Sequence, residues 1–320
     1  MSTFPTEAEF EEFFTTLSNW GRWGADDRIG TLNFIDNGVR AHAASLVELG
    51  RVVSLARDMD PDDADPLERG TVLERTMEVY SAEAMGKLLG MAPGEEVRLG
   101  GVREEITMIP HGSNTHLDGF GHISWRGNNY NNVPATAVRS DGGSTELSVH
   151  QAYEGFITRG VLLDITRAKG VDWLEPGYRV TSEDLDEAER LQGIRVGMGD
   201  ALLLYTGNFK RIAAEGLHSE LHHPGFSTEA LPWLHDREVS MISSDNINDA
   251  NPAGFEAKDL TIPVHSVALV AMGLWMVDNM RLDELAATCA ELGRWEFMFS
   301  MLPWRFIGVT SSPVNPIALF

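Results

Sequence analysis

The sequence predicts a mixed α and β protein of the α/β class, and three observations support this. Short apolar runs typical of strands recur along the chain, and segments with helical periodicity fall between several of them. No internal repeat or Pro/Ser-rich linker divides the 320 residues. With 43% apolar and 23% charged residues, the chain has the composition of a globular protein with a large core. We therefore expect a single domain over residues 1–320, with an N-terminal arm over about residues 1–35.

The N-terminal region predicts two helices and a strand. Thr6 and Glu9 have the spacing of a capping box, which predicts a first helix of about ten residues. The Trp- and Gly-rich stretch that follows, residues 19–35, has the character of an arm packed on another surface. A second helix is expected over residues 39–49, ended by Gly50 and followed by a strand in "RVVSLA".

Six further apolar runs predict the main strands, and one segment between them is clearly helical. The helix is "TSEDLDEAERLQG", which has acidic residues in its first turn and a closing glycine. The chain lacks a Gly-rich loop of the kind that cradles dinucleotides or phosphates, which argues against a nucleotide cofactor. The six strand runs are "EEITMI", "GVLLDI", "DALLLYTG", "EVSMISS", "LWMVDN" and "WEFMFSML".

Charge and cysteine content restrict the partners and the compartment. A formal net charge of -23 repels nucleic acid and anionic membrane surfaces, so we expect neither as a partner. Cys289 is the only cysteine, which excludes an internal disulfide and a thiolate-rich zinc site. The acidic N-terminus does not resemble a signal peptide, and no apolar stretch reaches membrane-spanning length. These features predict a cytoplasmic protein.

The segment "HGSNTHLDGFGH" holds three of the ten histidines and one aspartate within twelve positions. If the strand that precedes it continues, His116 and Asp118 point to one face and converge as ligands. We expect Gly119 and Gly121 to adopt backbone angles closed to other residues, so that the chain curls and returns His122 to the same point. His111 could reach in from the opposite end of the segment.

Imidazole and carboxylate together form the ligand set of zinc or manganese. Three protein ligands with one open position make a catalytic site, at which the metal activates water and polarises a carbonyl. The alternative is that these histidines only bond to backbone groups in a tight, glycine-rich turn. The sequence favours a divalent metal site whose ligands come from His111, His116, Asp118 and His122.

The motif resembles that of a family of metal-dependent hydrolases, often labelled cyclases, that includes bacterial kynurenine formamidase, isatin hydrolase and trans-dienelactone hydrolase. Its hallmark is His-x-Gly-Thr-His-x-Asp-x-x-x-His, of which "NTHLDGFGH" supplies the last part. His111 sits one position earlier than the first histidine of the motif, and Asn114 replaces a glycine. Further segments that resemble the family, in the right order, are "WGADDRIGTLNFI", "REVSMISSDN", "IPVHSVALVAMGLWMVDNMRLDELA" and "VTSSPVNPIALF".

The resemblance implies further site residues. The formamidases add a second metal-binding pair, a histidine and a glutamate, whose counterparts here are His265 and Asp278. Since aspartate is one methylene shorter than glutamate, we expect a single-metal site. Asp245 could orient a ligand or contact substrate at a strand end, although an Asx turn explains it nearly as well. Trp23 and Phe120 are candidates for an aromatic substrate pocket, whereas His218 and His222 read as a surface or entrance loop.

The resemblance also implies a fold, an activity and an assembly. The fold is the swivelling β/β/α fold of the cyclases, and the assembly is a homodimer or homotetramer. The activity is hydrolysis of an amide, cyclic amide or lactone bond of a small aromatic or cyclic substrate. The water is activated by a metal that His111, His116 and Asp118 hold, and His122 moves the protons. Two alternatives remain, a ring-closing cyclase of secondary metabolism and a non-catalytic metal-binding protein.

Overall fold

A computed structural model describes residues 4–60, 73–98, 101–108, 111–112, 114–216 and 222–320. These residues form two compact units, and each is treated separately here. The first unit comprises Met1–Arg57 with Asn114–Phe320, and the second comprises Asp58–Ser113. The expectation of one domain over the whole chain stays a prediction.

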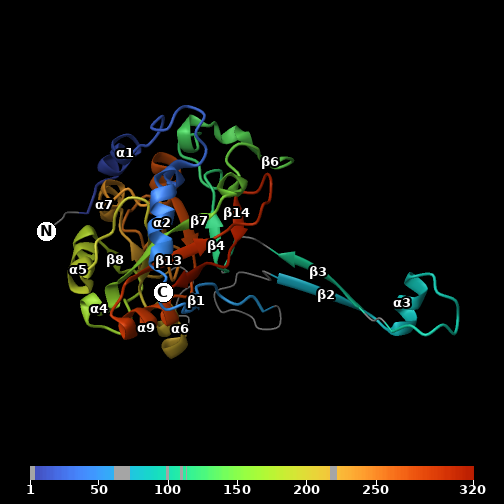
Figure 1. The fold of residues 1–320 in the computed structure, drawn as a ribbon. Coiled ribbons are helices and arrows are strands. Elements are labelled where there is room, and N and C mark those ends of the chain that lie inside the picture. The colour runs from blue at the N-terminus through green and yellow to red at the C-terminus, as the bar shows by residue number, and fades with distance from the viewer. Residues whose placement is uncertain (1–3, 61–72, 99–100, 109–110, 113, 217–221) are drawn as a thin grey trace. The chain divides into compact units, whose positions relative to one another are not determined.

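A nine-stranded sheet is the centre of the first unit (Figure 1). Its four middle strands are parallel to one another, and the remaining pairs are antiparallel. All five strands predicted from apolar runs in this unit are present, as is the strand predicted in "RVVSLA". In spatial order the strands are β1 (Val52–Ser54), β15 (Ile317–Leu319), β13 (Glu296–Met301), β7 (Phe156–Asp164), β9 (Ala201–Tyr205), β11 (Met241–Ser244), β12 (Trp275–Asp278), β4 (His116–Asp118) and β14 (Ser311–Pro313).

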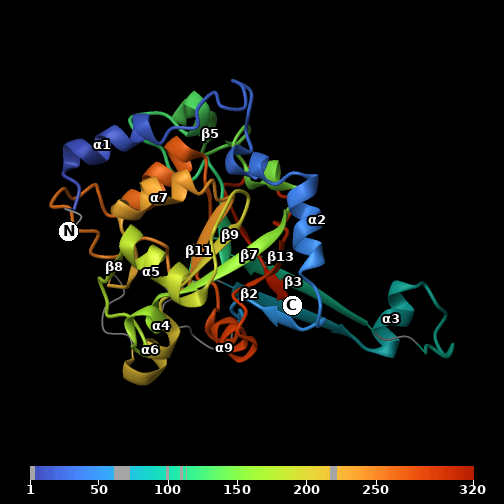
Figure 2. The ribbon, with the colours of Figure 1, turned by 60° about the vertical axis from the view of Figure 1, so that its left-hand side comes forward.

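The parallel strands carry the hydrophobic core. Every residue of β9, β11 and β12 is buried, which fits a parallel sheet covered on both faces. Figure 2 shows α2 (Asn37–Ser45) and α5 (Ser182–Gln192) on opposite sides of these strands. The other helices of this unit are α1 (Glu7–Thr16), α4 (Ile165–Lys169), α6 (Asn208–Glu215), α7 (Leu231–Asp236), α8 (Pro263–His265), the π-helix η6 (Ser266–Met272) and α9 (Asp283–Leu292).

Two of the three predicted helices are confirmed, and the bounds of the other were wrong. The capping box of Thr6 and Glu9 starts α1, and Gly193 in the left-handed conformation ends α5. The second helix occupies Asn37–Ser45, because the Asp36 side chain accepts a hydrogen bond from the Val39 amide and starts the helix earlier. It also ends well before Gly50. None of the helices in the described part of the chain is long and apolar enough to cross a membrane.

The N-terminal arm packs against its own unit. Asn19 donates its backbone N–H to Ala271 O at 3.0 Å, and the Trp20 indole donates to Val270 O at 2.6 Å. Thr31 donates its backbone N–H to Gly273 O at 2.9 Å. The arm therefore covers the π-helix that follows His265.

The second unit is a β-hairpin with a short helix. Strands β2 (Leu73–Tyr80) and β3 (Gly101–Met108) are antiparallel, with Val79 opposite Val102, and α3 (Ala82–Leu88) follows β2. The strand predicted over residues 104–109 is confirmed through Met108, and Ile109 lies outside the described residues.

Candidate metal centre

Strand β4 holds the first two predicted ligands on one face. It lies between β12 and β14, and its register places His116 directly opposite Asp278 of β12. Because side chains alternate along a strand, His116 and Asp118 share one face, and Asp278 joins them from the neighbouring strand. All three side chains are buried.

The two glycines that follow Asp118 allow close packing of a neighbouring loop, and neither adopts an unusual backbone angle. Neither Gly119 nor Gly121 has a positive φ, so the expectation of unusual backbone angles was wrong. A Cβ on Gly121 would lie 2.8 Å from Ser144 Oγ, and one on Gly119 would lie 3.1 Å from a methyl group of Val149. Glycine at these positions lets the loop that carries Ser144 and Val149 pack directly on the segment that follows His116 and Asp118.

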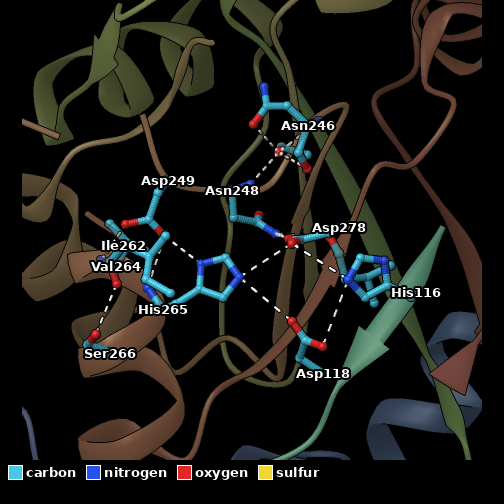
Figure 3. Close-up of polar contacts among 12 residues, drawn as sticks. His116, Asp118, Asn246, Asn248, Asp249, Ile262, Val264, His265, Ser266 and Asp278 are labelled. Carbon is cyan, nitrogen blue, oxygen red and sulfur yellow. Dashed lines mark hydrogen bonds and ion pairs between the residues drawn. The ribbon is translucent and has the colours of Figure 1, made fainter. Parts of the chain in front are cut away.

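Four ionisable side chains converge in the buried cluster shown in Figure 3. His116 Nε2 lies 3.9 Å from Asp118 Oδ1 and 3.9 Å from Asp278 Oδ2. His265 Nε2 lies 3.7 Å from Asp118 Oδ2 and 3.4 Å from Asp278 Oδ2. The two carboxylates therefore lie between the two imidazoles, as a shared set of donors. Asp278, although shorter than a glutamate, does reach the predicted ligands.

His265 enters the cluster from the helix that leads into η6. Asp249 holds it there, because one carboxylate oxygen accepts the Val264 amide at 2.7 Å and the other accepts the His265 amide at 3.0 Å. The second oxygen also lies 2.5 Å from His265 Nδ1. A bond from Nδ1 to this carboxylate leaves Nε2 directed at Asp118 and Asp278, as in the carboxylate–histidine pairs that orient metal ligands.

His116 and Asp278 are oriented in the same manner. His116 Nδ1 lies 2.8 Å from Asn114 O, so that a proton on Nδ1 leaves Nε2 as the nitrogen that faces the cluster. The Asn248 side chain donates to Asp278 Oδ1 at 2.5 Å. The remaining oxygen, Oδ2, is the one that faces both imidazoles.

The electrostatics of the cluster follow from its burial and its charges. Burial by itself lowers the pKa of His265, but the charge of Asp278 and the hydrogen bond with Asp249 raise this pKa well above its usual value. Burial likewise raises the pKa of Asp278, and the adjacent imidazoles of His265 and His116 bring it below its ordinary range. The carboxylates thus hold positive charge in the cluster, as a proton on His265 or as a cation in its place.

The cluster suits a divalent cation. Ligand atoms of His116, Asp118 and Asp278 all lie within 4.8 Å of one another. Asp118 Oδ1 is buried and accepts no hydrogen bond from any residue that the structure describes. A buried carboxylate oxygen without a donor is costly, and a metal ion would satisfy it. Two imidazole nitrogens with carboxylate oxygens are ligands that zinc and manganese accept.

The remaining predicted site residues lie in several places. His122 is half-buried, and one of its ring nitrogens lies within 4.8 Å of a carboxylate oxygen of Asp118. His111 belongs to the second unit, so its role as a ligand stays a prediction. His222 is exposed, and His218 lies outside the described residues.

Asp245 and the two aromatic residues make contacts of their own. Asp245 is fully buried and accepts hydrogen bonds from Thr206 and from the Asn208 amide, at the start of α6. Phe120 packs in the core against Trp275, with ring centroids 4.3 Å apart. The half-buried Trp23 packs against Phe34, with centroids 5.1 Å apart. As pocket residues, Trp23 and Phe120 remain predictions.

Sequence reasoning missed Asn248 and Asp249, which orient two members of the cluster. Both follow β11 in "SSDNINDANP", far along the chain from the histidine motif. The signal that was available is the run of amide and carboxylate side chains directly after a buried parallel strand, the edge at which α/β sheets bind ligands.

Comparisons with known proteins agree with this architecture. The model of the Cyclase family, described as "Putative cyclase", matches residues 42–249. The crystal structure of a novel cyclase is 30% identical and superposes with a TM-score of 0.82, covering 95% of this chain and 100% of that chain. A search among curated proteins finds no match.

Two isatin hydrolases share the fold at lower identity. Isatin hydrolase A from Labrenzia aggregata, bound to benzyl benzoate, is 22% identical with a TM-score of 0.54, covering 86% of this chain and 94% of that chain. An isatin hydrolase bound to the product analogue thioisatinate is 17% identical with a TM-score of 0.54, covering 88% and 96%. The predicted cyclase-like α/β fold is thus confirmed. The match to the Cyclase family model spans more than half of the 320 residues of the chain, so the chain belongs to the Cyclase family.

Proposed function

We propose that this protein is a metal-dependent hydrolase that cleaves an amide, cyclic amide or lactone bond of a small molecule. The observation that carries the proposal is the buried convergence of His116, Asp118, Asp278 and His265, in which Asp118 Oδ1 accepts no hydrogen bond from a described residue. The family membership supports an enzyme built on this site.

Each residue of the site has a separate task. His116, Asp118 and Asp278 hold the metal together with His265, and His111 is a predicted further ligand. When bound, the metal supplies Lewis acidity for the carbonyl and lowers the pKa of water towards neutrality. His122, half-buried near Asp118, takes a proton from the attacking water and returns it to the leaving group.

The relatives and the pocket predicted in the sequence support a cyclic or aromatic substrate. Two solved structures with this fold are isatin hydrolases, and one of them is bound to the product analogue thioisatinate. A cyclic or aromatic substrate also suits the predicted pocket residues Trp23 and Phe120.

Metal analysis with a substrate screen tests the proposal. Purified protein should carry about one zinc or manganese per chain, and a chelator should abolish hydrolysis in a panel of formylated amines, cyclic amides and lactones. Readdition of the metal should restore it. Full hydrolytic activity of the metal-free protein would rule out a metal-dependent mechanism. Ring closure of the matching open-chain acids, without hydrolysis of the panel, would favour a cyclase instead.

A further inference from the structure

Arg211 is a buried cation that the proposed mechanism does not use. It lies on α6 and is 1% exposed. Its Nη2 donates to Asn208 Oδ1 at 3.3 Å, which is a neutral partner. Its Nε and Nη1 are buried and donate no hydrogen bond to any residue in the described part of the chain.

Such an arrangement is costly without a bound partner. Taking a guanidinium out of water costs several kcal/mol unless its charge is paired and its N–H groups are bonded. Arginine cannot escape this cost by losing its proton, since its pKa lies above about 12. An anion that accepts from these N–H groups would offset the cost, and the planar guanidinium fits a carboxylate especially well.

Arg211 is tied to the loop that orients the metal cluster. Asn208, its hydrogen-bond partner, donates its side-chain amide to Asp245 O at 3.3 Å and its backbone N–H to Asp245 Oδ2 at 3.0 Å. Asp245 directly follows β11, and Asn248 and Asp249 come next in the same loop. Arg211 therefore lies at the carboxyl edge of the parallel strands, where ligands bind in α/β sheets.

Two further arginines flank the ring of Phe209, on the same helix as Arg211. The guanidinium carbons of Arg57 and Arg281 lie 5.0 Å and 5.2 Å from the ring centroid of Phe209, which precedes Arg211 by two residues. Arg57 donates its backbone N–H to Thr115 Oγ1 at 3.0 Å. Thr115 is the residue immediately before His116 in the chain. Arg281 is paired with Asp283, whose Oδ2 lies 2.9 Å from its Nε, so the buried charge that favours an anionic ligand here is that of Arg211.

We infer that Arg211 binds a carboxylate group of a small-molecule ligand of this enzyme. Hydrolysis of a lactone or cyclic amide releases a carboxylate. In the proposed reaction, Arg211 would therefore bind the carboxylate of the product or of the substrate. That link rests on the proposed function, whereas binding of a carboxylate at Arg211 does not require the metal.

Calorimetric titration with benzoate tests the inference, and benzamide is its uncharged analogue. Metal-free protein, prepared with a chelator, should bind benzoate and not benzamide. Arg211→Gln should bind benzoate about tenfold or more weakly, because a hydrogen bond between charged groups is lost. Arg190→Gln is the matched control, since this exposed arginine on α5 pairs with Glu187 on the surface, and it should bind benzoate as the wild type does.

A second measurement covers the case in which Arg211→Gln fails to fold. In the wild-type protein, benzoate should shift the NMR resonance of the Arg211 Nε–H group, and benzamide should not. The inference is overturned if Arg211→Gln binds benzoate as tightly as the wild type, or if this resonance does not move. Benzoate binding only to metal-loaded protein would assign the carboxylate to the metal. Equal affinity for sulfate would show a general anion site and reject the carboxylate assignment.

Discussion

Among the single residues of the site, the proposed metal ligands are more deeply buried than the residue proposed to transfer protons. His116 and Asp118 are buried on one strand face, whereas His122 is half-buried beyond the turn. His116→Ala and Asp118→Ala should therefore lose metal and activity together, because each removes a donor from a small set. His122→Ala should keep most of its metal and lose on the order of a hundredfold or more in turnover. Metal content and turnover of all three variants check this.

The same three variants can also contradict the assignment of His122 as the proton carrier. If His122→Ala loses metal as completely as His116→Ala, then His122 is a ligand. The proton carrier would then have to be another titratable group near the cluster, and His265 is the first to test.

Asp249 should act on the metal through His265. Its two oxygens accept the amides of Val264 and His265, and one of them also bonds to His265 Nδ1. In Asp249→Asn one oxygen becomes an NH₂ group, so either an amide loses its acceptor or His265 Nδ1 meets a donor. Metal affinity, measured by competition with a chelator, should fall about 10- to 100-fold.

A matched substitution shows whether the effect is specific. Asp259→Asn removes an exposed carboxylate from the same connection between β11 and α8, and it should leave metal affinity unchanged. Equal metal affinities of Asp249→Asn and the wild type would show that Asp249 does not contribute to metal binding.

Part of the site could be predicted from the sequence, and the reason is local geometry. The alternation of side chains along a strand places His116 and Asp118 together, and this needs only three consecutive residues. Asp278 and His265 came from the resemblance to the family alone. Asn248 and Asp249 were missed because a hydrogen bond between segments far apart in the chain leaves no periodic trace in the sequence.

At the scale of elements, burial decided what the sequence could predict. Strands β7, β9, β11 and β12 are apolar runs because helices cover both faces of the parallel region, so their positions could be predicted. Their order in the sheet depends on pairing between distant segments and could not. The end of α2 was misplaced because the amides of Leu49 and Gly50 donate to Phe320 O, a contact with the far end of the chain.

Asp245 should make the start of α6 sensitive to pH. Burial raises its pKa to about 7, against hydrogen bonds from Thr206 and Asn208 that lower it. In the unfolded chain its pKa is about 4, so the folded protein binds more protons between about pH 4 and pH 7. The contribution of Asp245 to stability is therefore full at low pH and is lost as pH rises through this window.

Thermal unfolding of wild type and Asp245→Asn measures this contribution. The melting temperature of the wild type minus that of Asp245→Asn should decrease from about pH 5 to about pH 8, because asparagine does not titrate. A difference that stays constant across this range would mean that Asp245 is ionised throughout.

At the scale of the whole molecule, the hairpin of the second unit presents an apolar face. The pairing of β2 with β3 places Met77, Val79, Val102 and Ile106 on one face, where each of them is exposed beside Arg75 and Glu104. A two-stranded hairpin is marginally stable by itself, and exposed apolar faces of this kind mark interaction surfaces. The family resemblance implies homodimers or homotetramers, so we propose that a second copy of the chain covers this face.

A double substitution on the hairpin should separate the copies while preserving the hairpin. Val79 and Val102 are directly opposite, so Val79→Lys with Val102→Glu places opposite charges across the strands and puts them on the apolar face. Light scattering should find the wild type as an oligomer and this variant shifted towards the 35.3 kDa monomer. Thr76→Lys places a lysine opposite Glu105 on the other face, and it should leave the assembly intact. A wild-type monomer, or equal dissociation by Thr76→Lys, would show that the apolar face is not the interface.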